Sequence, residues 1–482
     1  MVNPILAGPA ASTSRSAALS ARWALAGLSL SVLLSSLGTS IANVALPTLA
    51  QAFGASFQDV QWVVLAYLLA ITTLIVSVGR LGDLTGRRRL LLAGIALFTV
   101  ASVVCAAAPT LWLLICARAA QGLGAAVMMS LTMAFMGETV PKERTGSAIG
   151  LLGTMSAVGT ALGPSLGGVL ISAAGWRALF LVNVPLGALA LVLARRHLPA
   201  DRRTEPAERA GLDVVGTLLL ALTLASYALA MTIGRGHFGL LNVALLSATV
   251  VGINLFVHAE ARAASPLLRL SMFCDSALSA SLIMSALVST VMMATLVVGP
   301  FYLSRSLGLD AAPIGAVSSV GPLVAALAAV PAGRVADRMG ARRMAVVGLV
   351  AMVVGAVLLS VLPATLGIYG YLAPIVIMTL GYATFQTANN TAVMANVASD
   401  HRGVVSGVLN LSRNLGLVTG ASVMGAVFSL ASGTSDVTTA PPGSVATGMR
   451  TTFAVAASLV VIALAIGTNR QAAKKNEIRE LS

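Results

Sequence analysis

The sequence predicts an all-α polytopic membrane protein of fourteen transmembrane helices, arranged as two six-helix bundles with two inserted helices. Three observations predict this class. Of the 482 residues, 57% are hydrophobic and only 10% are charged, whereas a soluble chain carries about 25% charged residues. The apolar residues form long uninterrupted runs, and the second part of the chain repeats motifs of the first. This composition excludes a soluble enzyme, a disordered chain and a fibrous protein.

Each apolar run has about the length that a helix needs to cross a bilayer, roughly 20 residues. The runs do not alternate apolar and polar residues, as the strands of a membrane β-barrel would. The expected spans lie near residues 23–45, 61–79, 90–108, 111–134, 146–171, 178–194, 213–231, 239–257, 277–300, 313–332, 344–362, 369–394, 404–429 and 451–468.

The distribution of basic residues predicts the orientation. With the N-terminus in the cytoplasm, 24 of the 30 Lys and Arg residues fall in inside segments, 4 in outside loops and 2 within spans. Basic residues favour the cytoplasmic side of a membrane, so both termini are expected in the cytoplasm of a bacterial cell, with the chain in the cytoplasmic or inner membrane. Contact with anionic headgroups accounts for the net charge of +14, and no nucleic-acid partner is expected.

Two motifs recur at matching offsets. GRLGDLTGRRR begins at Gly79 and GRVADRMGARR at Gly333, 254 residues later; RTGSAIG begins at Arg144 and RGVVSGV at Arg402, 258 residues later. Such offsets indicate two parallel six-helix halves, an architecture found in transporters. The expected division is a tail over 1–22, a first bundle over 23–194, a linker with the inserted helix pair over 195–276, a second bundle over 277–468 and a tail over 469–482.

With these repeated loop motifs, the chain resembles the major facilitator superfamily, and more closely its fourteen-helix drug:proton antiporters of the EmrB/QacA type. The resemblance covers essentially the whole chain. It implies the major facilitator fold, and a conformational latch in which the loop motifs hold the cytoplasmic side closed and release it on switching. The latch residues would be Gly79, Asp83, Gly86, Arg87, Arg88, Asp337, Arg338 and Arg342. The alternative is that these charges only anchor the loops at the membrane surface.

The fifth expected span contains the run GTALGPSLGG. Its Gly159, Gly163 and Gly167 recur every four residues on one helix face, where they would let another helix approach closely. Together with Pro164 and Gly168 the run resembles the family's antiporter motif, which implies export rather than import. The alternative is a small-residue packing face without a role in transport.

Arg118 lies within the fourth expected span, where a charged side chain is costly and faces the bundle interior or a cavity. It resembles the family's embedded basic residue, which implies a role in proton coupling. The alternative is a structural arginine bonded to backbone carbonyls. In the first span, Gly38 stands where the family has an acidic residue, and no span has an acidic residue at its middle. This departure favours neutral, zwitterionic or anionic amphiphiles over hydrophobic dications as substrates.

The resemblance also implies which polar and flexible side chains face the central substrate cavity. These are Asn43, Gln121, Met128, Gln386, Asn389, Asn390 and Arg413. Hydrogen bonds between helices explain the amides of residues 386, 389 and 390 equally well, and ordinary packing is an alternative for the methionine.

The expected function is therefore a secondary active exporter of drugs or other amphiphiles, driven by the proton gradient through alternating access. The alternatives are a dedicated exporter of one metabolite, such as a siderophore or an antibiotic, not necessarily coupled to protons, and a membrane receptor without transport. No ATP-binding motif, metal-ligand spacing or dinucleotide fingerprint occurs, so neither an enzyme nor a cofactor or metal is expected. The expected partners are a small amphiphilic substrate, protons and the lipid bilayer, with a periplasmic adaptor if the cell is Gram-negative.

Overall fold

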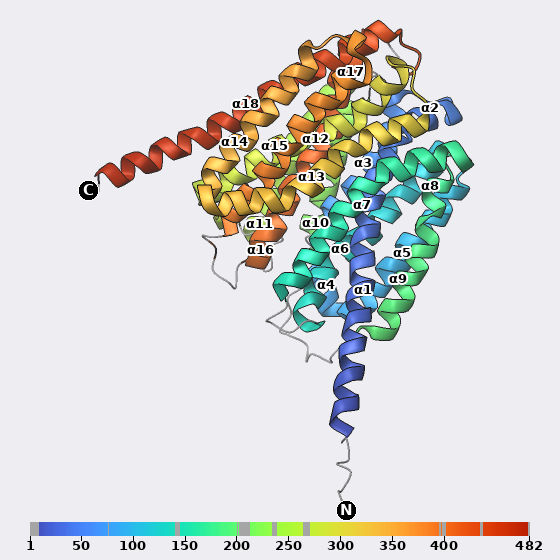
Figure 1. Cartoon of the computed structure of the whole chain (residues 1–482), viewed down its shortest axis with the longest axis vertical. Coiled ribbons are helices and arrows are strands. Elements are labelled where there is room, and N and C mark those ends of the chain that lie inside the picture. Colours follow the sequence, from blue (N-terminus) through green and yellow to red (C-terminus); the bar gives the residue numbers. More distant parts are fainter. Residues whose placement is uncertain are drawn as a thin grey trace, which may run out of the picture.

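The computed structural model describes residues 9–75, 77–139, 145–199, 201, 213–233, 239–263, 270–394, 397, 402–433 and 437–480 (Figure 1). Nearly all of these residues are helical. The first half contains α1 (Pro9–Val44), α2 (Leu46–Phe53), α3 (Phe57–Leu74), α4 (Val78–Thr85), α5 (Arg87–Ala107), α6 (Leu111–Thr139), α7 (Thr145–Ala174), α8 (Ala178–Leu181) and α9 (Asn183–His197).

Two helices separate the halves, α10 (Val214–Thr232) and α11 (Leu240–Arg262), and they pack against each other. The second half contains η2 (Leu270–Cys274), α12 (Ser276–Arg305), α13 (Ala311–Met339), α14 (Ala341–Val361), η3 (Ala364–Leu366), α15 (Gly367–Met394), α16 (Arg402–Thr419), η4 (Gly420–Met424), α17 (Gly425–Ala431) and α18 (Pro442–Glu480). The predicted boundaries between bundles, tails and linker remain predictions.

Fourteen helical segments within the described residues are long and apolar enough to cross a membrane, which confirms the expected number. Several boundaries differ from the expected ones by four residues or more, and two of these differences have a clear local cause. The second span begins at Phe57 rather than near 61, because Ser56 and Asp59 form a capping box that starts α3 there. The last span begins at Pro442 rather than near 451, since proline is well suited to the first turn of a helix.

The two halves converge at one end of the molecule and diverge toward the other (Figure 1). We call the convergent end, which carries α2, α8 and α17, the far face. The opposite end, where α1 begins and α18 ends, is the termini face. The hydrophobic core follows the same pattern: one cluster of buried side chains joins both halves, whereas two others belong to the first and to the second half. The structure is therefore closed at the far face.

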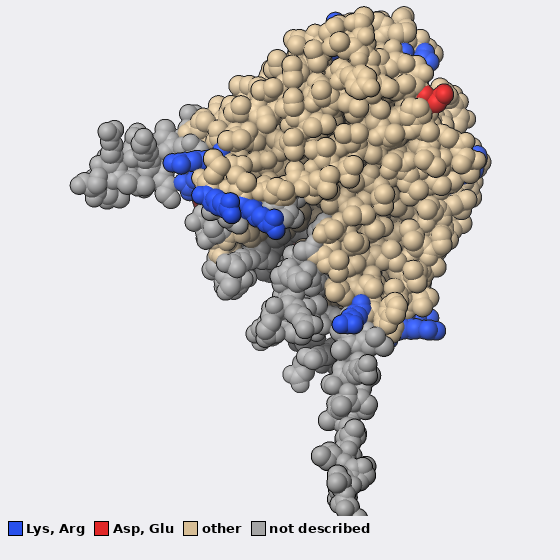
Figure 2. Space-filling model, viewed as in Figure 1, with Lys and Arg blue, Asp and Glu red and all other residues tan. Residues whose placement is uncertain are grey.

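The flank visible in Figure 2 is almost free of charged side chains over its described part. Lys and Arg gather at the edges of this apolar belt. Large aliphatic side chains point outward from several helices, with Leu222 of α10 64% exposed and Val251 of α11 56% exposed. A belt of this kind fits a hydrocarbon environment, in which backbone polar groups are satisfied within helices.

Candidate functional site: the interface between the halves and the buried arginine

Aromatic rings and amides join the halves at the far face. Phe57 of α3 packs edge-on against Phe301 of α12 and Phe428 of α17, with ring centroids 4.7 and 5.5 Å apart. Beside them, the Gln58 amide nitrogen donates to the Ser429 hydroxyl at 2.6 Å, and the Gln61 amide nitrogen donates to the Ala421 carbonyl at 2.9 Å. We call these contacts the far-face seal. The sequence offered one signal for the seal, two glutamines at the start of an apolar span.

The predicted glycine run contacts two different helices. Gly159 and Gly167 lie against α1, where an added Cβ would come within 2.6 Å of the Leu33 carbonyl and 2.7 Å of Val44. Gly168 instead faces the other half, where a Cβ would lie 2.6 Å from the carbonyl oxygen of Ala311 in α13. The run therefore permits close packing within its own half and also forms a contact between the halves.

Arg118 is completely buried on α6 and connects three helices of the first half. Its Nε donates to the Val63 carbonyl of α3 at 2.9 Å, and one Nη donates to the Gly38 carbonyl of α1 at 3.0 Å. The other Nη donates at 2.6 Å to the Gln121 amide oxygen. Tyr67 covers the guanidinium, with its ring centroid 4.1 Å from Cζ.

This arrangement explains how the first helix accommodates glycine at position 38. The Tyr67 hydroxyl donates to the Ser35 carbonyl at 2.8 Å, and a Cβ on Gly38 would approach that hydroxyl to 2.9 Å. The tyrosine thus fills the space that a larger side chain would need. The structure places Arg118 in contact with neutral acceptors, as the structural alternative expected.

The structure brings Gln121, a predicted cavity residue, into direct contact with Arg118, the predicted proton-coupling residue. Asn43 donates to the Thr39 carbonyl of its own helix at 3.0 Å, and Met128 is completely buried in the core of the first half. Asn389 is buried on α15 and donates to the Ser281 carbonyl at 3.3 Å. The remaining candidates are the partly buried Gln386 and the exposed Asn390 and Arg413. Their roles in substrate binding remain predictions.

The first loop motif contacts its own half in this conformation. Asp201, beyond the end of α9, accepts from the backbone amides of Arg88 and Arg89 at 2.7 and 3.3 Å, at the N-terminus of α5. The Arg88 guanidinium in turn donates to the Arg195 carbonyl. The side chains of Asp83 and Asp337 lie outside the described part of the structure, so the predicted latch remains a prediction.

Glu260, near the end of α11, is a buried carboxylate that sequence reasoning missed. Of the charged side chains that the structure describes, Arg118 and Glu260 are the two that are buried. A Cβ on Gly216 would touch the carboxylates of both Glu260 and Asp213, so these two acids are close neighbours. The only signal was an acidic residue three positions after the end of the expected span 239–257. No cluster of three or more metal-binding side chains occurs in the described ranges.

The repeated halves, the glycine contact and the buried arginine together describe a transporter architecture. The sequence matches the Major Facilitator Superfamily over residues 28–421 and 281–480. The chain belongs to the major facilitator superfamily. It is a transporter of this type and not an enzyme, and its fold agrees with the one that the sequence predicted.

The relatives of this major facilitator protein include both a multidrug pump and a transporter named for a single substrate. It is 32% identical over 409 residues to the multidrug efflux pump LfrA of Mycolicibacterium smegmatis, covering 84% of this chain and 80% of the relative. It is 30% identical over 397 residues to the riboflavin transporter RibZ of Clostridioides difficile, covering 82% and 86%. In fold it is similar to a bacterial homologue of the lysosomal transporter Spinster in an inward-facing, unoccupied conformation, with a TM-score of 0.67, 17% identity and coverage of 93% and 96%.

The cap that Asp201 forms at the N-terminus of α5 can be tested by mutation. Asp201→Ala removes the acceptor for the Arg88 and Arg89 amides. Losing such a cap costs about 1 kcal/mol, so hydrogen exchange at the first turn of α5 should quicken by about fivefold. Hydrogen–deuterium exchange with mass spectrometry measures this, and Asp201→Asn, which keeps one acceptor oxygen, should give a smaller change. Unchanged exchange at this turn in Asp201→Ala would refute the cap.

Proposed function

We propose that this protein is a secondary active exporter of amphiphilic compounds that works by alternating access and is driven by protons. The observation that carries the proposal is the contact of Gly168 with α13 of the other half. Small residues at this contact let two halves meet closely without interlocking side chains. Such an interface can separate and re-form, which alternating access requires.

Proton coupling needs a group whose protonation favours one conformation over the other. Two buried charges are candidates. Arg118 ties α1, α3 and α6 together, so a change in its hydrogen bonds would shift all three helices. Glu260 is a buried acid near the end of α11 and lies beside Asp213. We propose Glu260 as the proton site, and Arg118 as the group that links α1, α3 and α6 mechanically.

The charge around Arg118 supports the proposed substrate class. The guanidinium makes its hydrogen bonds to uncharged acceptors and stacks on Tyr67. A buried cation in such neutral surroundings disfavours a second cation nearby. We therefore propose neutral, zwitterionic or anionic amphiphiles as substrates. The similarity to a riboflavin transporter favours the second candidate, an exporter dedicated to one neutral metabolite.

The branch of the superfamily, the membrane and the orientation of the chain are part of the same proposal. Fourteen spans and the two loop motifs support the drug:proton antiporter branch of the EmrB/QacA type. The excess of basic residues on one side supports a cytoplasmic or inner membrane with both termini in the cytoplasm. The far face would then lie outside, and in a Gram-negative cell it would be the side available to a periplasmic adaptor.

Flux into proteoliposomes under an imposed pH gradient tests this function. Riboflavin serves as a neutral probe and ethidium as a cationic one, within a panel of amphiphiles. We expect gradient-driven flux of several neutral compounds, its loss on adding a protonophore, and gradient-independent flux in Glu260→Gln, with Asp310→Asn, an exposed far-face acid, as the matched control. Flux that ignores the protonophore would contradict proton coupling. Flux of a single compound would favour the dedicated exporter.

A further inference from the structure

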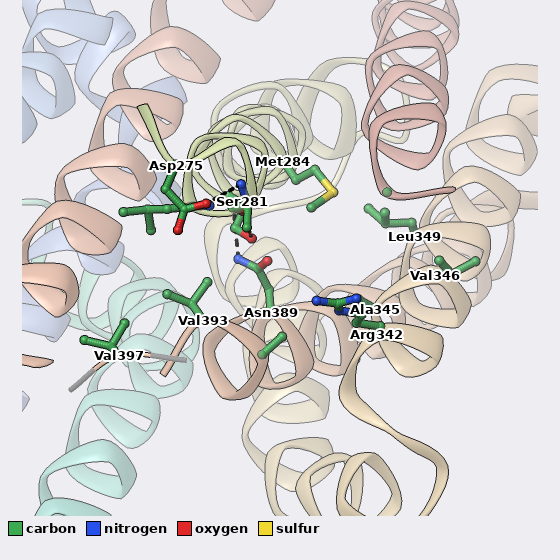
Figure 3. Close-up of a pocket in the computed structure, with 14 residues that line it drawn as sticks. Asp275, Ser281, Met284, Arg342, Ala345, Val346, Leu349, Asn389, Val393 and Val397 are labelled. Atoms are coloured by element: carbon green, nitrogen blue, oxygen red, sulfur yellow. Dashed lines mark hydrogen bonds between the residues drawn. The ribbon is translucent and has the colours of Figure 1, made fainter. Parts of the chain in front are cut away.

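A cavity of about 100 Å³ lies at the termini face of the second half (Figure 3). It is lined by residues of α12, α14, α15 and α18, together with Asp275 and Val397. A bound water occupies roughly 10–15 Å³ on this scale, so the cavity has room for a small polar headgroup. Met284, Leu349 and Val393 form apolar walls, and each of them is less than 9% exposed.

Opposite charges stand on either side of this cavity. Figure 3 shows Asp275 at one side and Arg342 at the other, with Ser281 and Asn389 between them. One oxygen of Asp275 caps α12 by accepting from the amides of Ala277 and Leu278, at 2.7 and 3.4 Å. A ligand that matches this arrangement carries an anion near Arg342 and a cation near Asp275.

The position of the cavity argues against a transport site. All of its lining residues belong to the second half, whereas alternating access opens and closes the space between the halves. Its outer helices present apolar side chains outward: Val347 and Val350 of α14 are 51% and 45% exposed, and Ile462 of α18 is 50% exposed. The surface beside the cavity therefore suits contact with lipid chains.

The first half supplies an internal comparison. Gly86 precedes α5 and Gly340 precedes α14, 254 residues apart in the repeated motif, and both have a positive φ, +97° and +91°. At Gly86, a Cβ would lie 2.5 Å from the carboxylate of Asp201. At Gly340, no described atom lies within 4 Å of that position. Among the described residues, the repeated helix start thus receives an anion from its own chain in the first half, whereas in the second half no described atom lies in the corresponding position.

We propose that this cavity binds the headgroup of a zwitterionic aminophospholipid, such as phosphatidylethanolamine, from the adjoining membrane leaflet. Its phosphate lies at Arg342 and the N-terminus of α14, where a helix start favours an anion. Its ammonium lies at Asp275. The beginning of an acyl chain contacts Met284 and Leu349 and leaves past Gly467, where α18 presents no side chain. The proposal concerns lipid binding and does not depend on the transported substrate.

Lipid retention by the full-length protein tests the proposal. Native mass spectrometry after purification from mixed vesicles should show phosphatidylethanolamine retained about tenfold over phosphatidylglycerol, the ratio that one charge-assisted contact of about 1.4 kcal/mol provides. Phosphatidylcholine, whose ammonium has no N–H group, should be retained less. Soluble phosphoethanolamine in millimolar excess should not displace the lipid. Equal retention of the three lipids, or displacement by phosphoethanolamine, would overturn the proposal.

Three variants locate the site. Asp275→Asn keeps the cap on α12, since asparagine caps as well as aspartate, but it removes the charge that faces the ammonium. Arg342→Gln removes the opposite charge, and Gly467→Leu fills the cavity from a position where a Cβ has no contact closer than 3.4 Å. Asp275→Asn and Gly467→Leu should reduce the tenfold preference to about twofold or less, whereas Arg342→Gln, which loses a contact to the phosphate that all three lipids carry, should lower the retention of all three. Arg343→Gln, the adjacent arginine that does not line the cavity, should keep both the preference and the retention. A preference unchanged in Asp275→Asn and Gly467→Leu, or lipid retention unchanged in Arg342→Gln, would overturn the proposal.

Discussion

Gly168→Leu should reduce transport by about 100-fold while leaving the protein folded. Gly168 contacts Ala311 and Gly315 of α13 in the other half, where even a Cβ would be too close. Overpacking such a contact costs about 3 kcal/mol, and the cost falls only on the conformation in which the far face is closed. A bias of that size shifts the equilibrium between two conformations by about 100-fold. Flux in proteoliposomes measures the loss.

Two comparison variants separate switching from folding. Val169→Leu changes the neighbouring residue, which is 58% exposed, and should transport like the parent. Gly163→Leu inserts the same side chain against Ser40 of α1, within one half, and should lower the yield of folded protein instead. Parental flux in Gly168→Leu would show that the halves need not meet at this glycine.

Arg118→Met and Arg118→Lys should both lower transport by more than tenfold. The guanidinium donates in three directions, to Val63, Gly38 and Gln121, and neither replacement can donate to all three acceptors. Each buried acceptor that loses its donor costs about 1–3 kcal/mol. In the methionine variant, relief of the desolvated charge offsets part of this cost. The thermal midpoint in detergent should therefore fall in both variants, together with the flux.

An exposed arginine provides the matched control. Arg177 lies over the ring of Trp176 at 4.4 Å, as Arg118 lies over Tyr67 at 4.1 Å, but Arg177 is exposed. Arg177→Met should change flux and thermal midpoint little, because exposed interactions of this kind contribute about 1 kcal/mol or less. If Arg118→Lys transported like the parent, charge alone would be sufficient, and the three-way connection of α1, α3 and α6 would not be needed.

The sequence predicted the number of spans, the repeat and the buried Arg118 because each rests on local chemistry: apolar length, recurring motifs and the cost of a charge in hydrocarbon. It did not predict the partners of these residues. In the sequence, Phe57 is one of several aromatic residues in an apolar chain. Only the packing of α12 and α17 against α3 shows that Phe301 and Phe428 contact it. The capping role of Asp201 and the burial of Glu260 likewise depend on how distant segments pack. Composition and spacing give no information about that packing.

The most direct test of alternating access is a reversible cross-link across the far face. Gln58→Cys and Ser429→Cys, with Cys105, Cys116 and Cys274 replaced by alanine, place two thiols where the far-face seal joins α3 to α17. A short thiol-reactive linker that a reductant cleaves should abolish flux in proteoliposomes, and reduction should restore it, while each single-cysteine variant should be unaffected. Undiminished flux through fully cross-linked protein would mean that this face never opens, and would contradict the account.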